Sequence, residues 1–157
     1  MKKHILRNCM ILVMGLVAMQ AIASAQDAPR LKGAWNVNVT INTCDPNSQF
    51  LRNVRALNLF IHDGSMTETG ASIPPARSRS SSVGTWRHVQ GNTYTSTFEF
   101  FRYNPDGSFF STAKVTRMIE LSQDGNQFIS TGTVEDFDVN GVGIGVTCPT
   151  ETATRAR

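Results

Sequence analysis

Regularly spaced turn signals are the feature of this 157-residue sequence that most restricts its fold. Clusters of Asn, Asp and Gly recur along the chain, and such clusters close tight reversals. They begin at residues 45 (DPNS), 62 (HDGS), 90 (QGN), 104 (NPDG), 123 (QDGN) and 139 (VNG). Between them lie runs rich in β-branched and aromatic residues, with the period-two alternation that is typical of strands. No stretch after residue 25 has a convincing helical period.

The runs between the turns predict eight strands. They span about 34–43, 54–61, 66–71, 83–89, 93–103, 108–121, 126–137 and 141 onward. Short strands joined by hairpins throughout favour one closed sheet, so we predict an all-β fold, an eight-stranded antiparallel up-and-down β-barrel. In such a barrel the odd-numbered connections share one end. They include the long loops at 44–53 and 72–82, so this end is expected to be the open mouth.

Alternation within each strand assigns an inward face. The expected inward residues are Trp35, Val37, Val39 and Ile41 in the first strand, Leu57, Leu59 and Ile61 in the second, Phe98 and Phe100 in the fifth, Val115 and Ile119 in the sixth, and Val142, Ile144 and Val146 in the eighth. The same parity predicts that Phe101, Tyr103 and Phe110 point outward. Exposed aromatic side chains favour a subunit contact, which predicts a homo-oligomer.

The first 25 residues are expected to be a secretory signal peptide, which leaves residues 26–157 as a single barrel domain. Three basic residues precede a short apolar run, which ends at a small-residue cleavage site at 23–25. The apolar run is shorter than the ~20 residues that a membrane-spanning helix needs, so no membrane insertion is expected. Without this segment the chain has 12 basic and 12 acidic residues. This balance gives no reason to expect a nucleic acid as partner.

Two cysteines, Cys44 and Cys148, follow the expected signal peptide. In an exported chain they are most simply one disulfide, so we expect a secreted or periplasmic protein. For the two residues to meet, the last strand must run past Cys148 to about Arg155. Pro149 must then lie at a bulge or a non-bonded position, because it has no N–H to donate. Two cysteines and two histidines, all distant in sequence, do not form a zinc-binding pattern, and no metal or cofactor is expected.

Gly33-Ala34-Trp35, at the head of the first strand, resembles the Gly-x-Trp motif of the lipocalins and the wider calycin superfamily. The resemblance implies that Trp35 packs across the closed end of the barrel, against a basic side chain from the last strand, here Arg155 or Arg157. Size and strand count also suit the avidin-like and allene-oxide-cyclase-like barrels. A second Gly-x-Trp, at 84–86, has no counterpart in the lipocalin pattern. Trp86 is interpreted as a core residue, with a ligand platform as the alternative.

The candidate site is a row of polar residues at inward positions. Parity places His88 on the same face as Trp86, and the short turns pair His88 with Tyr94, and Tyr94 with Arg117. Glu68 is expected to join the row from the third strand. The row is either a polar layer whose members satisfy one another or a set of contacts at the floor of an apolar pocket, which would orient an acidic or carbonyl ligand.

Three functions remain open at this stage. The first is a secreted lipocalin-like barrel that binds a small, mostly apolar molecule through Glu68, Trp86, His88, Tyr94 and Arg117. The second is an isomerase or cyclase of the allene-oxide-cyclase-like type, in which the same histidine, tyrosine and arginine do acid–base chemistry. The third is a barrel filled by its own side chains, which acts as an interaction or oligomerisation module.

Overall fold

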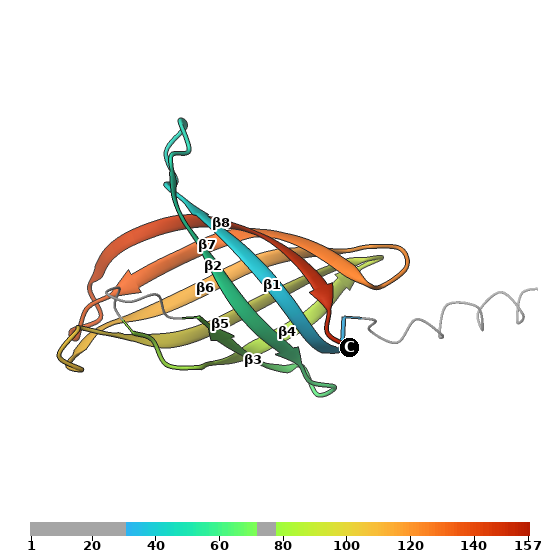
Figure 1. The fold of residues 1–157 in the computed structure, drawn as a ribbon, viewed down its shortest axis with the longest axis horizontal. Coiled ribbons are helices and arrows are strands. Elements are labelled where there is room, and N and C mark those ends of the chain that lie inside the picture. Colours follow the sequence, from blue (N-terminus) through green and yellow to red (C-terminus); the bar gives the residue numbers. More distant parts are fainter. Residues whose placement is uncertain (1–30, 72–77) are drawn as a thin grey trace, which may run out of the picture. The chain divides into compact units, whose positions relative to one another are not determined.

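The computed structural model describes residues 31–71 and 78–157 of the chain. It has eight strands, β1 (Gly33–Asn42), β2 (Phe50–Phe60), β3 (Ser65–Gly70), β4 (Ser82–Gln90), β5 (Thr93–Tyr103), β6 (Phe109–Leu121), β7 (Gln127–Phe137) and β8 (Gly143–Arg155). Each strand pairs antiparallel with the next and β8 pairs with β1, which closes the barrel (Figure 1). The predicted eight-stranded up-and-down barrel is therefore confirmed, and it is consistent with a calycin-like fold.

The expected signal peptide at 1–25 and most of the loop predicted at 72–82 lie outside the described residues. Among the residues that the structure describes, no helix has the length and apolar character that crossing a membrane requires.

Aspartate-based turns produce the hairpins. A side-chain oxygen of the turn aspartate accepts a backbone N–H two residues on in five connections: Asp45 from Asn47 at 2.9 Å, Asp63 from Ser65 at 2.8 Å, Asp106 from Ser108 at 3.0 Å, Asp124 from Asn126 at 3.1 Å and Asp138 from Asn140 at 2.9 Å. In the β5–β6 turn the next residue, Gly107, has a φ of +84°, a conformation that disfavours any side chain. The Asn/Asp/Gly clusters therefore reverse the chain by local chemistry.

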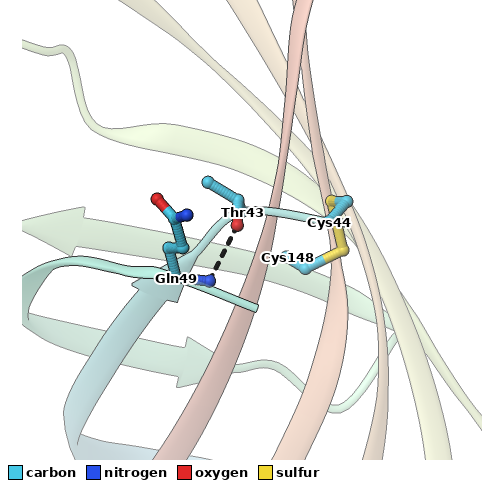
Figure 2. The surroundings of a disulfide bond; sticks show 4 residues. All are labelled: Thr43, Cys44, Gln49 and Cys148. Atoms are coloured by element: carbon cyan, nitrogen blue, oxygen red, sulfur yellow. Dashed lines mark hydrogen bonds between the residues drawn. A yellow bond between two sulfur atoms is a disulfide. The ribbon is translucent and has the colours of Figure 1, made fainter. Parts of the chain in front are cut away.

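The β1–β8 seam closes the barrel as the cysteines predicted. Trp35 lies opposite Arg155, and Asn42 lies opposite Cys148. Cys44 and Cys148 form a disulfide with a Cα–Cα distance of 5.0 Å. Figure 2 shows this bond beside the base of the β1–β2 loop, where the Gln49 backbone N–H donates to Thr43 Oγ1 at 2.9 Å.

Pro149 meets the condition set for it. It pairs with Ile41 of β1, but on its other side the β7–β8 ladder is interrupted between Thr131–Thr150 and Val134–Thr147. Pro149 therefore lies where no N–H is needed to pair with β7, which is the non-bonded position that was predicted for it.

The barrel interior forms three layers along its axis. At the end with the even-numbered turns, aromatic rings fill the interior: Trp35 packs edge-on against Phe128 at 5.0 Å between centroids, and Phe60 packs against Trp86 at 5.8 Å. A middle layer consists of buried polar side chains, namely Asn58, Glu68, Ser96, Arg117, Ser130 and Glu151. Toward the other end, the inward residues are again mostly apolar. The polar layer therefore separates a packed closed end from an apolar half.

Two of the predicted inward faces are wrong. In β2, Leu57, Leu59 and Ile61 are exposed, whereas Ala56, Asn58 and Phe60 are buried. Both faces of this strand carry large apolar groups, and the buried amide of Asn58 made the inward face look polar in the sequence. The faces predicted for the first, fifth and sixth strands are confirmed, with Val39 and Ile41 partly buried.

The eighth strand was also assigned to the wrong face. Val142, Ile144 and Val146 are about half exposed, and they alternate with the inward positions Gly143 and Gly145. Residues 143–147 pair with β7 alone, because pairing with β1 begins only at Cys148. This segment forms the rim of the open end and borders no packed core. Its alternating apolar residues therefore do not mark a buried face.

Of the three aromatic residues predicted to point outward, Phe101 is 49% exposed, while Tyr103 and Phe110 are partly buried. A bulge between Arg102 and Tyr103 shifts the register of the β5–β6 hairpin. It places Phe109 opposite Tyr103, and the exposed Phe109 ring packs edge-on against Phe101 at 6.0 Å. The outward aromatic pair is therefore Phe101 and Phe109.

Candidate binding cavity

The two Gly-x-Trp motifs both anchor the closed end. The indole N–H of Trp35 donates to the Leu31 carbonyl, and that of Trp86 donates to the Ile61 carbonyl, each at 2.9 Å. Both tryptophans are buried, so Trp86 is a core residue as interpreted, and it lines no part of the cavity described below.

Arg155 covers the Trp35 ring as the lipocalin resemblance implied. Its guanidinium carbon lies 4.3 Å from the ring centroid, and its N–H groups donate to the carbonyls of Gly125 and Lys32 at 2.8–3.0 Å. A Cβ at Gly33 would lie 2.9 Å from Arg155 Nη1, so the glycine leaves room for this cover. Stacking of a cation on an indole stabilises by about 0.5–2 kcal/mol.

Arg117 is the centre of the buried polar layer. It forms an ion pair with Glu151, and its Nε donates to Ser96 Oγ at 2.9 Å. Glu151 also accepts from Ser130 Oγ at 2.7 Å. In the amide orientation that satisfies both groups, Asn58 accepts from Arg117 Nη2 at 2.8 Å. Protein groups thus satisfy the hydrogen-bonding groups of the guanidinium. Of the two interpretations of this row, the structure supports the polar layer whose members satisfy one another.

His88 is not part of that layer. It pairs with Tyr94 as predicted, and the two rings lie 5.0 Å apart. However, the histidine is exposed, and its Nε2 lies 2.7 Å from the Gly91 carbonyl of its own turn. The predicted interior position of His88 is therefore wrong, because the residue stands at the rim of the closed end.

The predicted pairing of Tyr94 with Arg117 is also wrong. Tyr94 pairs with Ile119, and Arg117 pairs with Ser96. A turn one residue longer than predicted, with Tyr103 opposite Phe109, and the bulge between Arg102 and Tyr103 together move the register by two residues. The inward face is preserved, but the two side chains are separated. The structure therefore does not bring together the histidine and arginine on which the isomerase or cyclase hypothesis rested.

A cavity occupies the other half of the barrel, above the polar layer. Its apolar walls come from five strands and include Val39, Ile41, Val54, Phe98, Val115 and Val134. About 90 Å³ is open to the centres of water molecules. Two of its lining residues, Arg52 and Ala71, are exposed, so the cavity reaches the surface at the end with the odd-numbered connections.

Charged side chains stand among these apolar walls. Three arginines, Arg52, Arg79 and Arg102, line the cavity together with Glu68 and Glu151. Arg79 Nη1 donates to Glu68 Oε1 at 2.9 Å, and its guanidinium carbon lies 3.4 Å from the centroid of the Phe100 ring. Glu68 is therefore the one predicted site residue that borders the cavity.

Burial changes the pKa values of both members of the Glu68–Arg79 pair. Burial raises the pKa of the Glu68 carboxyl, against the opposing effect of the positive charge on Arg79. Burial likewise lowers the pKa of Arg79. Both directions mean that desolvation disfavours the charged forms more than the mutual attraction favours them.

Sequence reasoning missed the residues that make this cavity polar. Arg79 follows the long loop and Arg102 adjoins the β5–β6 bulge. At such irregular segments the alternation of a strand does not predict which side chains point inward. Arg52 was placed in a loop, whereas β2 begins at Phe50 and carries Arg52 inward opposite Ile41. Glu151 could have been found, since the Trp35–Arg155 pairing implied by the Gly-x-Trp resemblance gives residue 151 the same inward parity as Ala153.

Comparison with models of known protein families gives no match, and comparison with curated proteins gives none either. Within the described residues, no group of three or more His, Cys, Asp or Glu side chains could hold a metal ion. The geometry of the barrel is therefore the basis for any functional argument.

Proposed function

We propose that the protein is a lipocalin-like barrel that binds a small, mostly apolar molecule in its interior. The observation that carries this proposal is the cavity at the open end, with walls of valine, isoleucine and phenylalanine above a polar floor. Ligand sites are typically apolar concavities with a few polar groups that fix orientation. The closed end, filled by aromatic rings, directs any ligand to this half of the molecule.

The proposal includes export of the protein. A disulfide between Cys44 and Cys148 is compatible with an oxidising compartment, either the periplasm or the extracellular space. Edman sequencing of the protein recovered from culture supernatant and from periplasm would identify the compartment and the mature N-terminus. A start at Gln26 is expected, whereas recovery of the full chain from the cytosol would contradict it.

Filling the cavity tests the binding proposal. Val39→Phe adds a ring to the cavity wall, whereas Asn38→Phe adds the same ring to the exposed face of the same strand. Protein purified from its own host is analysed by native mass spectrometry, and binding of apolar probes is measured by isothermal titration calorimetry. A co-purifying small molecule should be present in wild type and in Asn38→Phe and absent from Val39→Phe. Equal ligand content in all three proteins would refute binding in the cavity.

A second candidate function, oligomerisation, rests on the outer face. Leu57, Leu59 and Val83 are 58%, 42% and 76% exposed, and the Phe101–Phe109 pair is also solvent-facing. Exposed apolar groups of this kind mark interaction surfaces. Light scattering after size exclusion is expected to show a dimer or larger species that Phe101→Ser dissociates. A monomer at all concentrations would exclude this second function.

A further inference from the structure

The cavity carries one positive charge more than its neighbours neutralise. Arg79 is paired with Glu68, and Arg102 Nε donates to Asp136 Oδ1 at 2.7 Å. The other lining carboxylate, Glu151, is already engaged by Arg117 below the cavity. Among the described residues, no carboxylate lies within ion-pair distance of Arg52. Among the described residues, Arg52 is therefore the lining arginine at the mouth that has no ion-pair partner of its own.

Arg52 is held where a ligand in the cavity would meet it. It lies opposite Ile41, on the inward face of β2, between the apolar cavity wall and solvent. Within the described residues, 50–54 of β2 pair with β1 only, since the contacts with the segment of β3 begin at Arg55, whose carbonyl accepts from the Ala71 N–H. Partial burial and the like charge of Arg102 lower the pKa of Arg52, against the smaller opposing effect of Asp136, so a nearby anion would favour its charged form.

A second donor in the same cavity lacks an acceptor. Arg79 Nη2 is buried and has no hydrogen-bond partner in the part of the chain that the structure describes. Buried donors are almost always satisfied, and an exception commonly marks a bound water, ion or ligand. The side chains of Arg79 and Arg52 border the same cavity from different segments of the chain.

We propose that the ligand is a small apolar monocarboxylate, with its carboxylate held at the mouth by Arg52 and Arg79 and its apolar body inside the cavity. This inference rests on the proposed binding function and assigns the chemical class of the ligand. A single unneutralised positive charge matches a monoanion, and guanidinium groups form the charge-assisted, two-pronged hydrogen bonds that a carboxylate accepts. The apolar walls of the cavity suit a short aliphatic body. Hexanoate has this chemistry and serves as the probe.

The decisive experiment compares hexanoate with hexanamide, which has the same shape and no charge. Binding of each is followed by ¹H–¹⁵N NMR titration of the full mature protein at constant ionic strength. We expect hexanoate to bind roughly 10- to 100-fold more tightly than hexanamide, because hydrogen bonds to charged groups are the strong ones. Shifts should concentrate at Val39, Val54 and Phe100.

Arg52→Gln and Arg55→Gln form a matched pair of variants. Both remove one positive charge from β2, but Arg55 is exposed and lies between the inward positions Val54 and Ala56. Hexanoate affinity should fall roughly 10- to 100-fold in Arg52→Gln and stay within about twofold in Arg55→Gln. Arg52→Lys keeps the charge without the planar fork and should give an intermediate affinity.

Two results would overturn this inference without affecting the proposed binding function. One is hexanamide binding as tightly as hexanoate. The other is an equal loss of hexanoate binding in both glutamine variants, which would indicate a general effect of net charge. If neither molecule binds and Val39→Phe changes nothing, the cavity binds no ligand of this size and the proposed function fails with the inference. Near-ultraviolet circular dichroism confirms that each variant is folded.

Discussion

Arg117 shows, at the scale of the residue, how an interior charge is tolerated in this barrel. It is 3% exposed, and its partner Glu151 is 6% exposed, so neither group regains water if the other is lost. Arg117→Met is therefore expected to lower the free energy of unfolding by about 3–5 kcal/mol, because it strands a buried carboxylate. Chemical denaturation followed by tryptophan fluorescence measures the change.

A double substitution separates the lost pair from lost packing. Arg117→Met with Glu151→Met removes both charges and should recover at least half of that loss. Thr116→Met, on the outer face of the same strand, should stay within about 0.5 kcal/mol of wild type. A double variant as unstable as the single one would show that the ion pair is not the reason for the loss.

Glu68 is expected to make the free energy of unfolding depend on pH. Its pKa in the folded protein is raised above the ordinary value of 4.5, chiefly by burial. The folded state therefore binds this proton more tightly than the unfolded chain does. The resulting stability is fully present below about pH 4.5 and is lost as the pH rises through the folded pKa.

Comparison with Glu68→Gln isolates this effect, because the glutamine does not titrate. The unfolding free energy of wild type minus that of Glu68→Gln should fall as the pH is raised from about 4 to about 8. Thermal or urea unfolding at closely spaced pH values measures it. A difference that grows with pH would mean that the attraction of Arg79 outweighs the burial of Glu68.

At the scale of the element, the seam between β1 and β8 depends on one cross-link and one stacked arginine. The disulfide joins residues 104 apart in sequence, and closing a loop of this length stabilises by about 4–5 kcal/mol in the chain-entropy model. The double variant Cys44→Ser/Cys148→Ser should lose a comparable amount in urea unfolding. Cys44 is exposed and Cys148 partly so, hence lost side-chain packing contributes little. A loss below about 1 kcal/mol would contradict this prediction and would mean that other contacts between β1 and β8 stabilise the closed barrel.

The strands themselves were predictable because their signals are local. Turn residues such as Asp106 and Gly107 reverse the chain through contacts within a few residues, so strand number, order and most boundaries follow from the sequence. Local sequence does not decide which face of a strand points into the barrel. Leu57 and Asn58 show this, since the amide is buried only because Arg117, from a distant strand, supplies its partner.

The candidate site was less predictable than the fold, for two physical reasons. A bulge after Arg102 and a turn one residue longer than predicted together move the β5–β6 register by two residues, which separates Tyr94 from Arg117 although both stay inward. The charges at the cavity come from irregular segments, including Arg79 after the long loop. Alternation carries no information across such segments, so the sequence did not indicate that these arginines line the cavity.

At the scale of the whole molecule, the two halves of the barrel differ in how they are held. The closed half contains aromatic rings in edge-on contact, above which the Arg117 layer is fully bonded. At the open half, among the described residues, 143–147 pair with β7 alone and 50–54 with β1 alone. Strand segments with a neighbour on one side, little core beneath them and exposed backbone open at low free-energy cost.

Native-state hydrogen exchange should therefore divide the barrel across its axis. Amides of Tyr94, Ser96 and Ile119 are expected to exchange only through global unfolding, with opening free energies that fall steeply as guanidinium is added. Amides of 143–147 and 50–53 should exchange through local openings whose free energies are lower by several kcal/mol and nearly independent of denaturant. The measurement is ¹H–¹⁵N NMR exchange at low guanidinium concentrations. Equal protection in both halves would contradict this division, because it would require the rim segments to be as tightly held as the aromatic end that the two tryptophans anchor.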